Sequence, residues 1–352
     1  MDDPLWITAH APTIADLPQP EVRDYLDRVA GEPFNLLVHG PAGAGKTAAV
    51  QALARAAHDD PDNDLIVINV ADFFDRTKTE IRDDPRFEHF LQGQTEFSKQ
   101  YRRGTDQRNK YKREWSKREM ITHVLKEMAG YQPSSGSFKT ILLDNAESIR
   151  EDFQQSLRRI MERYSETTQF VVATRQPTAL IPAIRSRCVP IPMRAPTSEE
   201  IAAVITSIAD AEDVAADADG VAFVAGYANG DLRAAILGAQ TVAATTGEIT
   251  RETAYETLRE IGDDDAIADM LETADAGEFE DARSILDDLL YDEGYEGREL
   301  LTEVLRVART RNLGIDLAAL TQTAATVDFD LALGTNDRLH LAHLLADLGA
   351  ES

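Results

Sequence analysis

Short, continuous apolar runs alternate with helical patterns over the first half of the chain. Four of these runs read NLLVHG (35–40), LIVINV (65–70), TILLD (140–144) and QFVVAT (169–174). A helical pattern follows the first run at 47–58, and another separates the last two at 153–164. Apolar strands that alternate with helices are typical of a parallel sheet covered on both faces. The pattern therefore predicts an α/β domain.

Beyond about residue 192 the apolar positions recur with helical spacing only. Thr197 and Glu200 form the signature of a capping box and predict a helix that runs to about Ile208. Residues 282–290 place five apolar side chains on one helical face: Ala282, Ile285, Leu286, Leu289 and Leu290. Further helices are expected at about 297–311 and 337–348, and no strand is expected in this half.

We therefore expect three parts. Residues 1–192 form the α/β domain, with an insertion at about 75–135, residues 193–262 a small helical domain, and residues 263–352 an all-helical domain. A chain of 352 residues is long enough for two or three such domains, each with its own core.

The composition of the chain indicates the environment in which the protein is expected to work. The chain has 62 acidic against 36 basic residues, a net charge of −26, and 43% hydrophobic residues, so it is expected to fold rather than to be disordered. Such an acid excess is typical of proteins from a high-salt cytoplasm and predicts a halophilic source. A single cysteine, Cys188, excludes a disulfide framework and fits a reducing cytoplasm. No apolar run approaches the roughly 18 residues of a membrane helix, so no membrane association is expected.

Residues 40–47, GPAGAGKT, match the phosphate-loop motif G-x-x-x-x-G-K-[ST] between a predicted strand and a helix. The residues predicted to cradle the phosphates are Gly40, Pro41, Ala42, Gly43, Ala44, Gly45, Lys46 and Thr47. Lys46 should reach the β- and γ-phosphates, and Thr47 should ligate Mg²⁺. Asp144 ends a later strand, where its carboxylate can hold the same ion through water. The predicted cofactors are ATP and Mg²⁺.

Several further motifs carry a family resemblance. They are LLDNAE (142–147), FQQSLRRIME (153–162), IRSRC (184–188), NGDLRAAI (229–236) and, more weakly, YDEGYEGRELL (291–301) with GTNDRLHLAHLLA (334–346). Together with the phosphate loop, their order and spacing resemble the small subunits of replication factor C, the archaeal and eukaryotic sliding-clamp loader. The resemblance implies an AAA+ ATPase domain, a small helical lid and an all-helical collar. It also implies a subunit that binds ATP and helps load the clamp onto primed DNA.

The resemblance implies two further site residues and a set of partners. Arg187 would be the arginine finger, which enters the site of a neighbouring subunit and stabilises charge on the γ-phosphate. Arg233 would be a second sensor, reaching from the lid to the phosphates. The implied partners are sibling loader subunits, the sliding clamp and primed DNA.

Three departures from the family concern hydrolysis. Asn145 stands where the family usually has the glutamate that activates water, and an amide cannot accept a proton. Arg175 stands where the family has a short polar sensor, and TAHAP (8–12) replaces an N-terminal segment near the adenine, with His10 at an aromatic position. Glu147 is not expected to reach the water that the missing glutamate would activate.

These departures leave three hypotheses. The chain is a working ATPase in which another group substitutes, a scaffold that binds ATP and supplies Arg187 to a sibling, or an origin-binding AAA+ initiator. The third should carry a basic winged helix near its end, yet Arg283 is the only basic residue beside 12 acids in 261–292.

Residues 99–118 oppose the acidic trend of the chain. They hold nine Lys or Arg against two acids, with Tyr101, Tyr111 and Trp115 interleaved. Such a segment could contact nucleic-acid phosphates, including those of primed DNA, or the acidic surface of a protein, or it could have no partner.

Overall fold

The protein divides into two compact units, Met1–Arg251 and Glu252–Ser352. The computed structural model describes residues 5–83, 116–134, 136–261, 264–311, 313–334 and 336–350. Most of the basic segment predicted to bind a partner, at 99–115, lies outside the described residues. The further division of the first unit near residue 192 stays a prediction.

A five-stranded parallel sheet forms the centre of the first unit, in the order β2-β3-β4-β1-β5. The strands are β1 (Leu36–His39), β2 (Leu65–Asn69), β3 (Lys139–Asp144), β4 (Thr168–Thr174) and β5 (Val189–Pro192). The first four confirm the predicted strands. The fifth was not predicted, because it contains two prolines. It tolerates them as an edge strand, which pairs with β1 alone.

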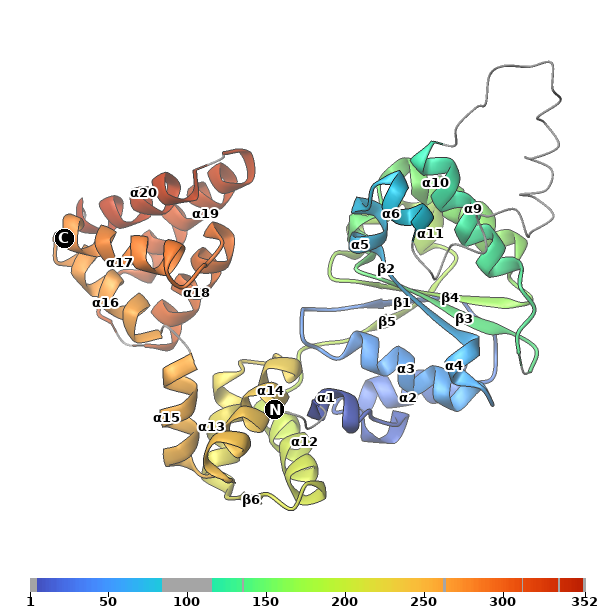
Figure 1. Ribbon diagram of the computed structural model, residues 1–352, viewed down its shortest axis with the longest axis horizontal. Coiled ribbons are helices and arrows are strands. Elements are labelled where there is room, and N and C mark those ends of the chain that lie inside the picture. The colour runs from blue at the N-terminus through green and yellow to red at the C-terminus, as the bar shows by residue number, and fades with distance from the viewer. Residues whose placement is uncertain are drawn as a thin grey trace. The chain divides into compact units, whose positions relative to one another are not determined.

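Helices cover both faces of this sheet (Figure 1). One face carries α2 (Pro20–Val29), α3 (Lys46–Ala57) and α4 (Pro61–Asp64). The other carries α5 (Val70–Asp75), α6 (Lys78–Asp83), α9 (Lys117–Gly130), α10 (Glu151–Arg163) and α11 (Pro182–Arg185). Side chains alternate between the two layers: Leu36 and Val38 pack with α2 and α3, whereas Leu37 packs with the opposite layer. Burial on both faces explains the continuous apolar runs of β1, β3 and β4.

The rest of the first unit is a helical bundle that begins with the predicted capping box. The Thr197 hydroxyl accepts the Glu200 N–H at 3.2 Å, and the Glu200 carboxylate accepts the Thr197 N–H at 2.8 Å. The helices are α12 (Ser198–Ala211), α13 (Ala218–Tyr227) and α14 (Leu232–Thr246), with α1 (Trp6–Ala9) packed on α14. The expectation of no strand here was wrong. Two-residue strands β6 (Ala215–Ala216) and β7 (Glu248–Ile249) pair in parallel, and they are too short to leave a periodic signal.

The second unit is helical in all its described elements. After α15 (Arg251–Ile261), which spans the boundary, come α16 (Asp264–Asp275), α17 (Phe279–Tyr291), α18 (Gly297–Thr310), α19 (Leu317–Leu333) and α20 (Asp337–Ala350). The apolar face predicted within 282–290 lies in α17. Three of its members, Ala282, Leu286 and Leu289, are buried in the core of this unit. None of the described helices of the chain is long and apolar enough to cross a membrane.

A buried lysine starts β3, an interior strand of the sheet. Lys139 is 2% exposed, and its ammonium donates to the Tyr131 carbonyl oxygen. Burial lowers the pKa of Lys139 to about 8, although the Asp64 carboxylate partly opposes this shift. Burial of the charge therefore costs the folded state free energy, and this cost is relieved when the proton leaves.

This lowered pKa predicts a pH-dependent stability. Below pH 8 both the folded and unfolded states hold the proton, so the cost is present in full. Between pH 8 and 10.5 the folded state releases it first, and the free energy of unfolding rises. Relative to Lys139→Met, the wild type should gain about 2–3 kcal/mol over this interval, measured by denaturant unfolding at each pH. Parallel stability curves for the two proteins would show that Lys139 titrates normally.

Candidate nucleotide-binding site

The phosphate loop connects the end of β1 to the start of α3, as the sequence predicts. Gly45 has a left-handed backbone, with φ 91°, and α3 begins at Lys46. The glycines also allow close neighbours. A β-carbon at Gly40 would lie 1.9 Å from the Met193 carbonyl oxygen, and one at Gly43 would lie 2.1 Å from Asp231 Cγ. The loop therefore needs glycine at these positions to avoid clashes with Met193 and Asp231.

Lys46 lies across this loop. Its Nζ donates to the carbonyl oxygens of Gly40 at 2.9 Å and Pro41 at 2.6 Å. Burial lowers the pKa of Lys46, and the carboxylates of Asp144 and Glu147 oppose that shift. An ammonium group held next to the N-terminus of a 12-residue helix fits a polyphosphate ligand.

The two predicted Mg²⁺ ligands are in direct contact. The Thr47 hydroxyl donates to Asp144 Oδ2 at 2.7 Å, although the residues are 97 positions apart in sequence. The contact forms because β3 lies beside β4, and β4 beside β1, so that Asp144 and the phosphate loop share one edge of the sheet. A hydroxyl and a carboxylate are oxygen donors of the kind that Mg²⁺ prefers. The pair thus fits the predicted ion.

Asn145 has a local structural reason to be asparagine. Its backbone is left-handed, with φ 55° and ψ 44°, a conformation that asparagine tolerates better than most residues. Its N–H donates to Asp144 Oδ1 at 3.0 Å, and its Nδ2 donates to Asn69 Oδ1 at 3.3 Å. The side-chain amide is thus bonded to the end of β2.

Glu147 and Arg175 form an ion pair at the end of β4, with Arg175 Nε 2.9 Å from Glu147 Oε1. The other carboxylate oxygen, Oε2, accepts the Thr174 hydroxyl at 2.7 Å and the Arg175 N–H at 3.2 Å. Burial raises the pKa of Glu147, but hydrogen bonds from Arg175 and Thr174 outweigh it, so the net pKa is lowered. Both oxygens of this carboxylate therefore accept hydrogen bonds.

The helical bundle of the first unit contacts the phosphate loop through the start of α14. The Leu232 N–H donates to the Gly43 carbonyl oxygen at 3.1 Å, and Asp231 caps α14 by accepting the Ala234 N–H at 2.9 Å. Arg233, the predicted second sensor, is exposed, and no ion pair joins it to another described residue. Arg233 is thus adjacent in sequence to Leu232, which contacts the phosphate loop directly.

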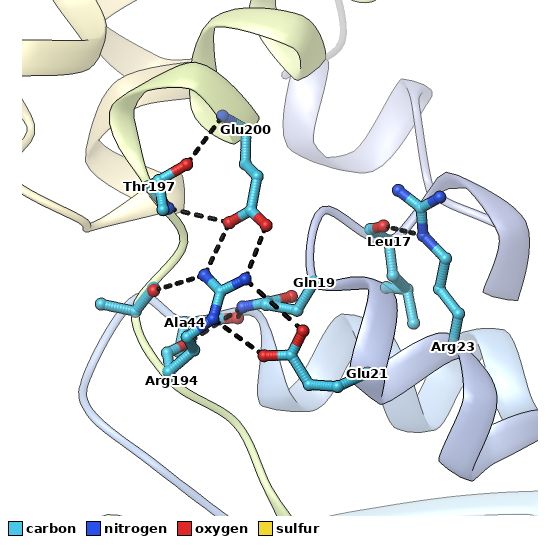
Figure 2. A network of polar contacts seen from close by, with 9 residues as sticks. Leu17, Gln19, Glu21, Arg23, Ala44, Arg194, Thr197 and Glu200 are labelled. Carbon is cyan, nitrogen blue, oxygen red and sulfur yellow. Dashed lines mark hydrogen bonds and ion pairs between the residues drawn. The ribbon is translucent and has the colours of Figure 1, made fainter.

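A polar network not predicted from the sequence joins the loop to the start of α12 (Figure 2). The buried Gln19 donates from Nε2 to the carbonyl oxygens of Ala44 and Arg194, both at 3.0 Å. Arg194 binds Glu200 with two hydrogen bonds of 2.6 and 2.7 Å and pairs with Glu21 at 2.8 Å. Hydrogen bonding to Glu200 raises the pKa of Arg194, so the guanidinium stays charged. No short motif reveals these contacts, because the partners are far apart in sequence.

The replaced N-terminal segment contacts the helical bundle. His10 Nε2 bonds to Glu212 Oε1 beyond the end of α12, and the Trp6 N–H donates to Gln240 Oε1 at 3.0 Å. His10 therefore has a structural partner in this chain.

Arg187, the predicted arginine finger, lies two residues beyond α11 and is exposed. Its Nη2 is 2.6 Å from Glu162 Oε1, and its Nη1 donates to the Ala183 carbonyl oxygen at 2.6 Å. The next residue, Cys188, is buried, and burial raises the pKa of its thiol to about 12. The arginine thus lies at the surface, whereas the cysteine is buried.

Comparison with known proteins decides the family. Residues 263–347 match the Replication factor C C-terminal domain, and residues 33–197 match the family DNA polymerase III, delta subunit. The replication factor C small subunit of Methanocella arvoryzae is 30% identical to this chain, over 90% of this chain and 86% of the relative. The chain belongs to the replication factor C small-subunit family. The replication factor C small subunit of Halobacterium salinarum is 27% identical to this chain, over 93% of this chain and 88% of the relative.

A solved structure supports the fold alone. The Thermotoga maritima RuvB Holliday junction branch migration motor superposes with a TM-score of 0.51 at 16% identity, over 81% of this chain and 87% of that one. The predicted AAA+ fold class and the role as a clamp-loader subunit in DNA replication are confirmed. The origin-binding alternative is not supported. Residues 264–350, where described, contain no strand, whereas a winged helix requires strands.

Proposed function

We propose that this clamp-loader subunit binds ATP with Mg²⁺ at its own phosphate loop. Lys46 and the N-terminus of α3 would hold the phosphates, and the Thr47 hydroxyl and Asp144 carboxylate would hold the ion. The bound Mg²⁺ would neutralise charge on the β- and γ-phosphates. Arg233 would reach the phosphates when the helical bundle closes on the nucleotide. The 2.7 Å contact between Thr47 and Asp144 supports this assignment.

The same site hydrolyses ATP slowly or not at all. One observation carries this part of the proposal: neither Asn145 nor Glu147, the two polar side chains after Asp144 at this edge of the sheet, offers a free carboxylate. Asn145 is neutral and bonded to Asn69, and both oxygens of Glu147 accept hydrogen bonds from Thr174 and Arg175. Loss of a general base commonly lowers a rate by about 10²- to 10⁴-fold. The chain would therefore hold ATP rather than turn it over.

The subunit acts within a hetero-oligomer of sibling loader subunits. Arg187 would enter the site of a neighbour, where a planar guanidinium stabilises charge that develops on the γ-phosphate. ATP binding would close the assembly around primed DNA and open the sliding clamp, and hydrolysis at sibling sites would release the clamp. Residues 99–118 are the candidate contact with DNA phosphates.

Replacing Asn145 with glutamate should give the site turnover that it lacks. The test is steady-state ATP hydrolysis by a reconstituted loader with clamp and primed DNA. Its sibling subunits carry glutamine at the water-activating position, so that they bind ATP without hydrolysing it. Against this low background, Asn145→Glu is expected to raise turnover by about 10- to 100-fold, because it restores the base.

Asn145→Gln is the matched control. Glutamine has the same length as glutamate and is equally strained in the left-handed backbone, but it cannot accept a proton. If the unaltered chain already turns over ATP in this complex, and Lys46→Ala abolishes that turnover, the holding-site proposal is wrong.

A further inference from the structure

We propose that Glu162 positions the Arg187 guanidinium for its action on the nucleotide of the neighbouring subunit. The inference rests on the proposed role of Arg187 in that site. It assigns a role to a carboxylate that lies outside the phosphate loop and its surrounding contacts.

Two bonds fix the guanidinium of Arg187 at its two terminal nitrogens. Nη2 is 2.6 Å from Glu162 Oε1, and Nη1 is 2.6 Å from the Ala183 carbonyl oxygen and 3.5 Å from the Ser186 hydroxyl. Among the described residues none accepts a hydrogen bond from Nε. The Nε–H and one Nη2–H therefore remain for phosphate oxygens, which guanidinium groups bind with paired donors.

Rigid elements carry both anchors of this arginine. Glu162 is in the last turn of α10, a helix whose Leu157, Ile160 and Met161 are buried in the core. Ala183 is in α11, next to the buried Ile184 of the same core. A side chain held between two packed helices keeps its geometry better than one on a free loop.

The pair has little value for stability, because the Arg187 and Glu162 side chains are 36% and 42% exposed. Ion pairs at such exposure contribute little to the free energy of unfolding. The pair instead matters for the orientation of the Arg187 side chain. An arginine side chain has many rotamers, and fixing them before the neighbour's nucleotide arrives removes an entropic cost from the transition state. Arg158 Nε lies 3.9 Å from the same carboxylate oxygen, so a second guanidinium faces Glu162.

The test is ATP turnover at sibling sites in the reconstituted loader with clamp and primed DNA. Glu162→Gln is expected to lower kcat by about 5- to 20-fold while KM changes less than about twofold, because positioning acts on the transition state. In an Arg187→Ala background the same substitution should have no further effect. Glu166→Gln is the matched control: Glu166 is exposed, four residues away, and its replacement changes the charge equally.

The outcomes separate this inference from the proposed function. If Arg187→Ala lowers sibling turnover but Glu162→Gln leaves it unchanged or raises it, Glu162 does not position the finger and the proposed function stands. An equal loss with Glu166→Gln, or a loss that persists in the Arg187→Ala background, also overturns the inference. If Arg187→Ala itself has no effect, the action of Arg187 in a neighbouring site is wrong, and the role of Glu162 falls with it.

Discussion

Replacing Arg187 with alanine is expected to lower ATP turnover at a neighbouring site of the loader by about 10³-fold or more. Arginine fingers that stabilise the transition state of phosphoryl transfer contribute factors of about 10³–10⁵. Arg187 is exposed at the surface of the first unit, where a neighbour can meet it. The measurement is single-turnover hydrolysis by a loader in which only the sibling that receives Arg187 retains its water-activating glutamate.

Two control variants make this result specific. Arg185→Ala removes the same charge from an exposed residue two positions away and should leave turnover nearly unchanged. Arg187→Lys keeps the charge but loses the planar fork, so it should recover only a small part of the rate. Full activity of Arg187→Ala would show that the finger comes from another residue, and equal losses for both alanine variants would point to a general charge effect.

The sequence predicted those features of the site that depend on contiguous residues and on the rules of parallel sheets. The phosphate loop is one continuous motif, so its position between β1 and α3 followed directly. The contact between Thr47 and Asp144 spans 97 positions, yet it was predictable. Parallel strands place their carboxyl ends at one edge of the sheet. Asp144 ends β3, and Thr47 lies in the first turn of α3, which follows the loop after β1.

Other features of the site could not be read from the pattern. The contacts of Gln19 with Ala44 and Arg194 depend on how loops approach each other in space. The left-handed backbone of Asn145 leaves no periodic signal, although it gives that residue a local reason beyond catalysis. That Glu147 does not replace the missing base stays a prediction, and the hydrogen bonds of its oxygens to Thr174 and Arg175 could not be foreseen from the sequence.

The contacts of Glu147 affect the interpretation of the departure at Asn145. A sequence departure at one position, Asn145, could be a tolerated exchange in which a nearby carboxylate substitutes. The nearby carboxylate, Glu147, forms an ion pair with Arg175, the residue of the second departure. The departures at Asn145 and Arg175 therefore both alter the part of the site expected to activate water. The residues expected to bind phosphate and metal remain in place.

Replacing Lys46 with alanine is expected to weaken ATP binding by about 10²- to 10³-fold. An ammonium that bonds to charged phosphate oxygens contributes about 1.5–3 kcal/mol per hydrogen bond. Loss of two such bonds at the lower end of this range, about 3–4 kcal/mol, corresponds to the expected loss of affinity. The Gly40 and Pro41 carbonyl oxygens that now bind Lys46 would also remain at the loop, close to the incoming phosphates. Equilibrium titration with a fluorescent ATP analogue and Mg²⁺ measures the loss.

The Lys46 result also tests whether holding ATP matters in a subunit that does not hydrolyse it. Lys78→Ala, at an exposed lysine of α6, removes the same charge and should leave ATP affinity unchanged. If ATP holds this subunit in its place in the assembly, Lys46→Ala should also lower turnover at the site that receives Arg187, even though that site is intact. Unchanged ATP affinity in Lys46→Ala would mean that the loop at 40–47 is not the nucleotide site. Lost affinity with full sibling turnover would mean that Arg187 is positioned without bound ATP, by the contacts of α10 and α11 alone.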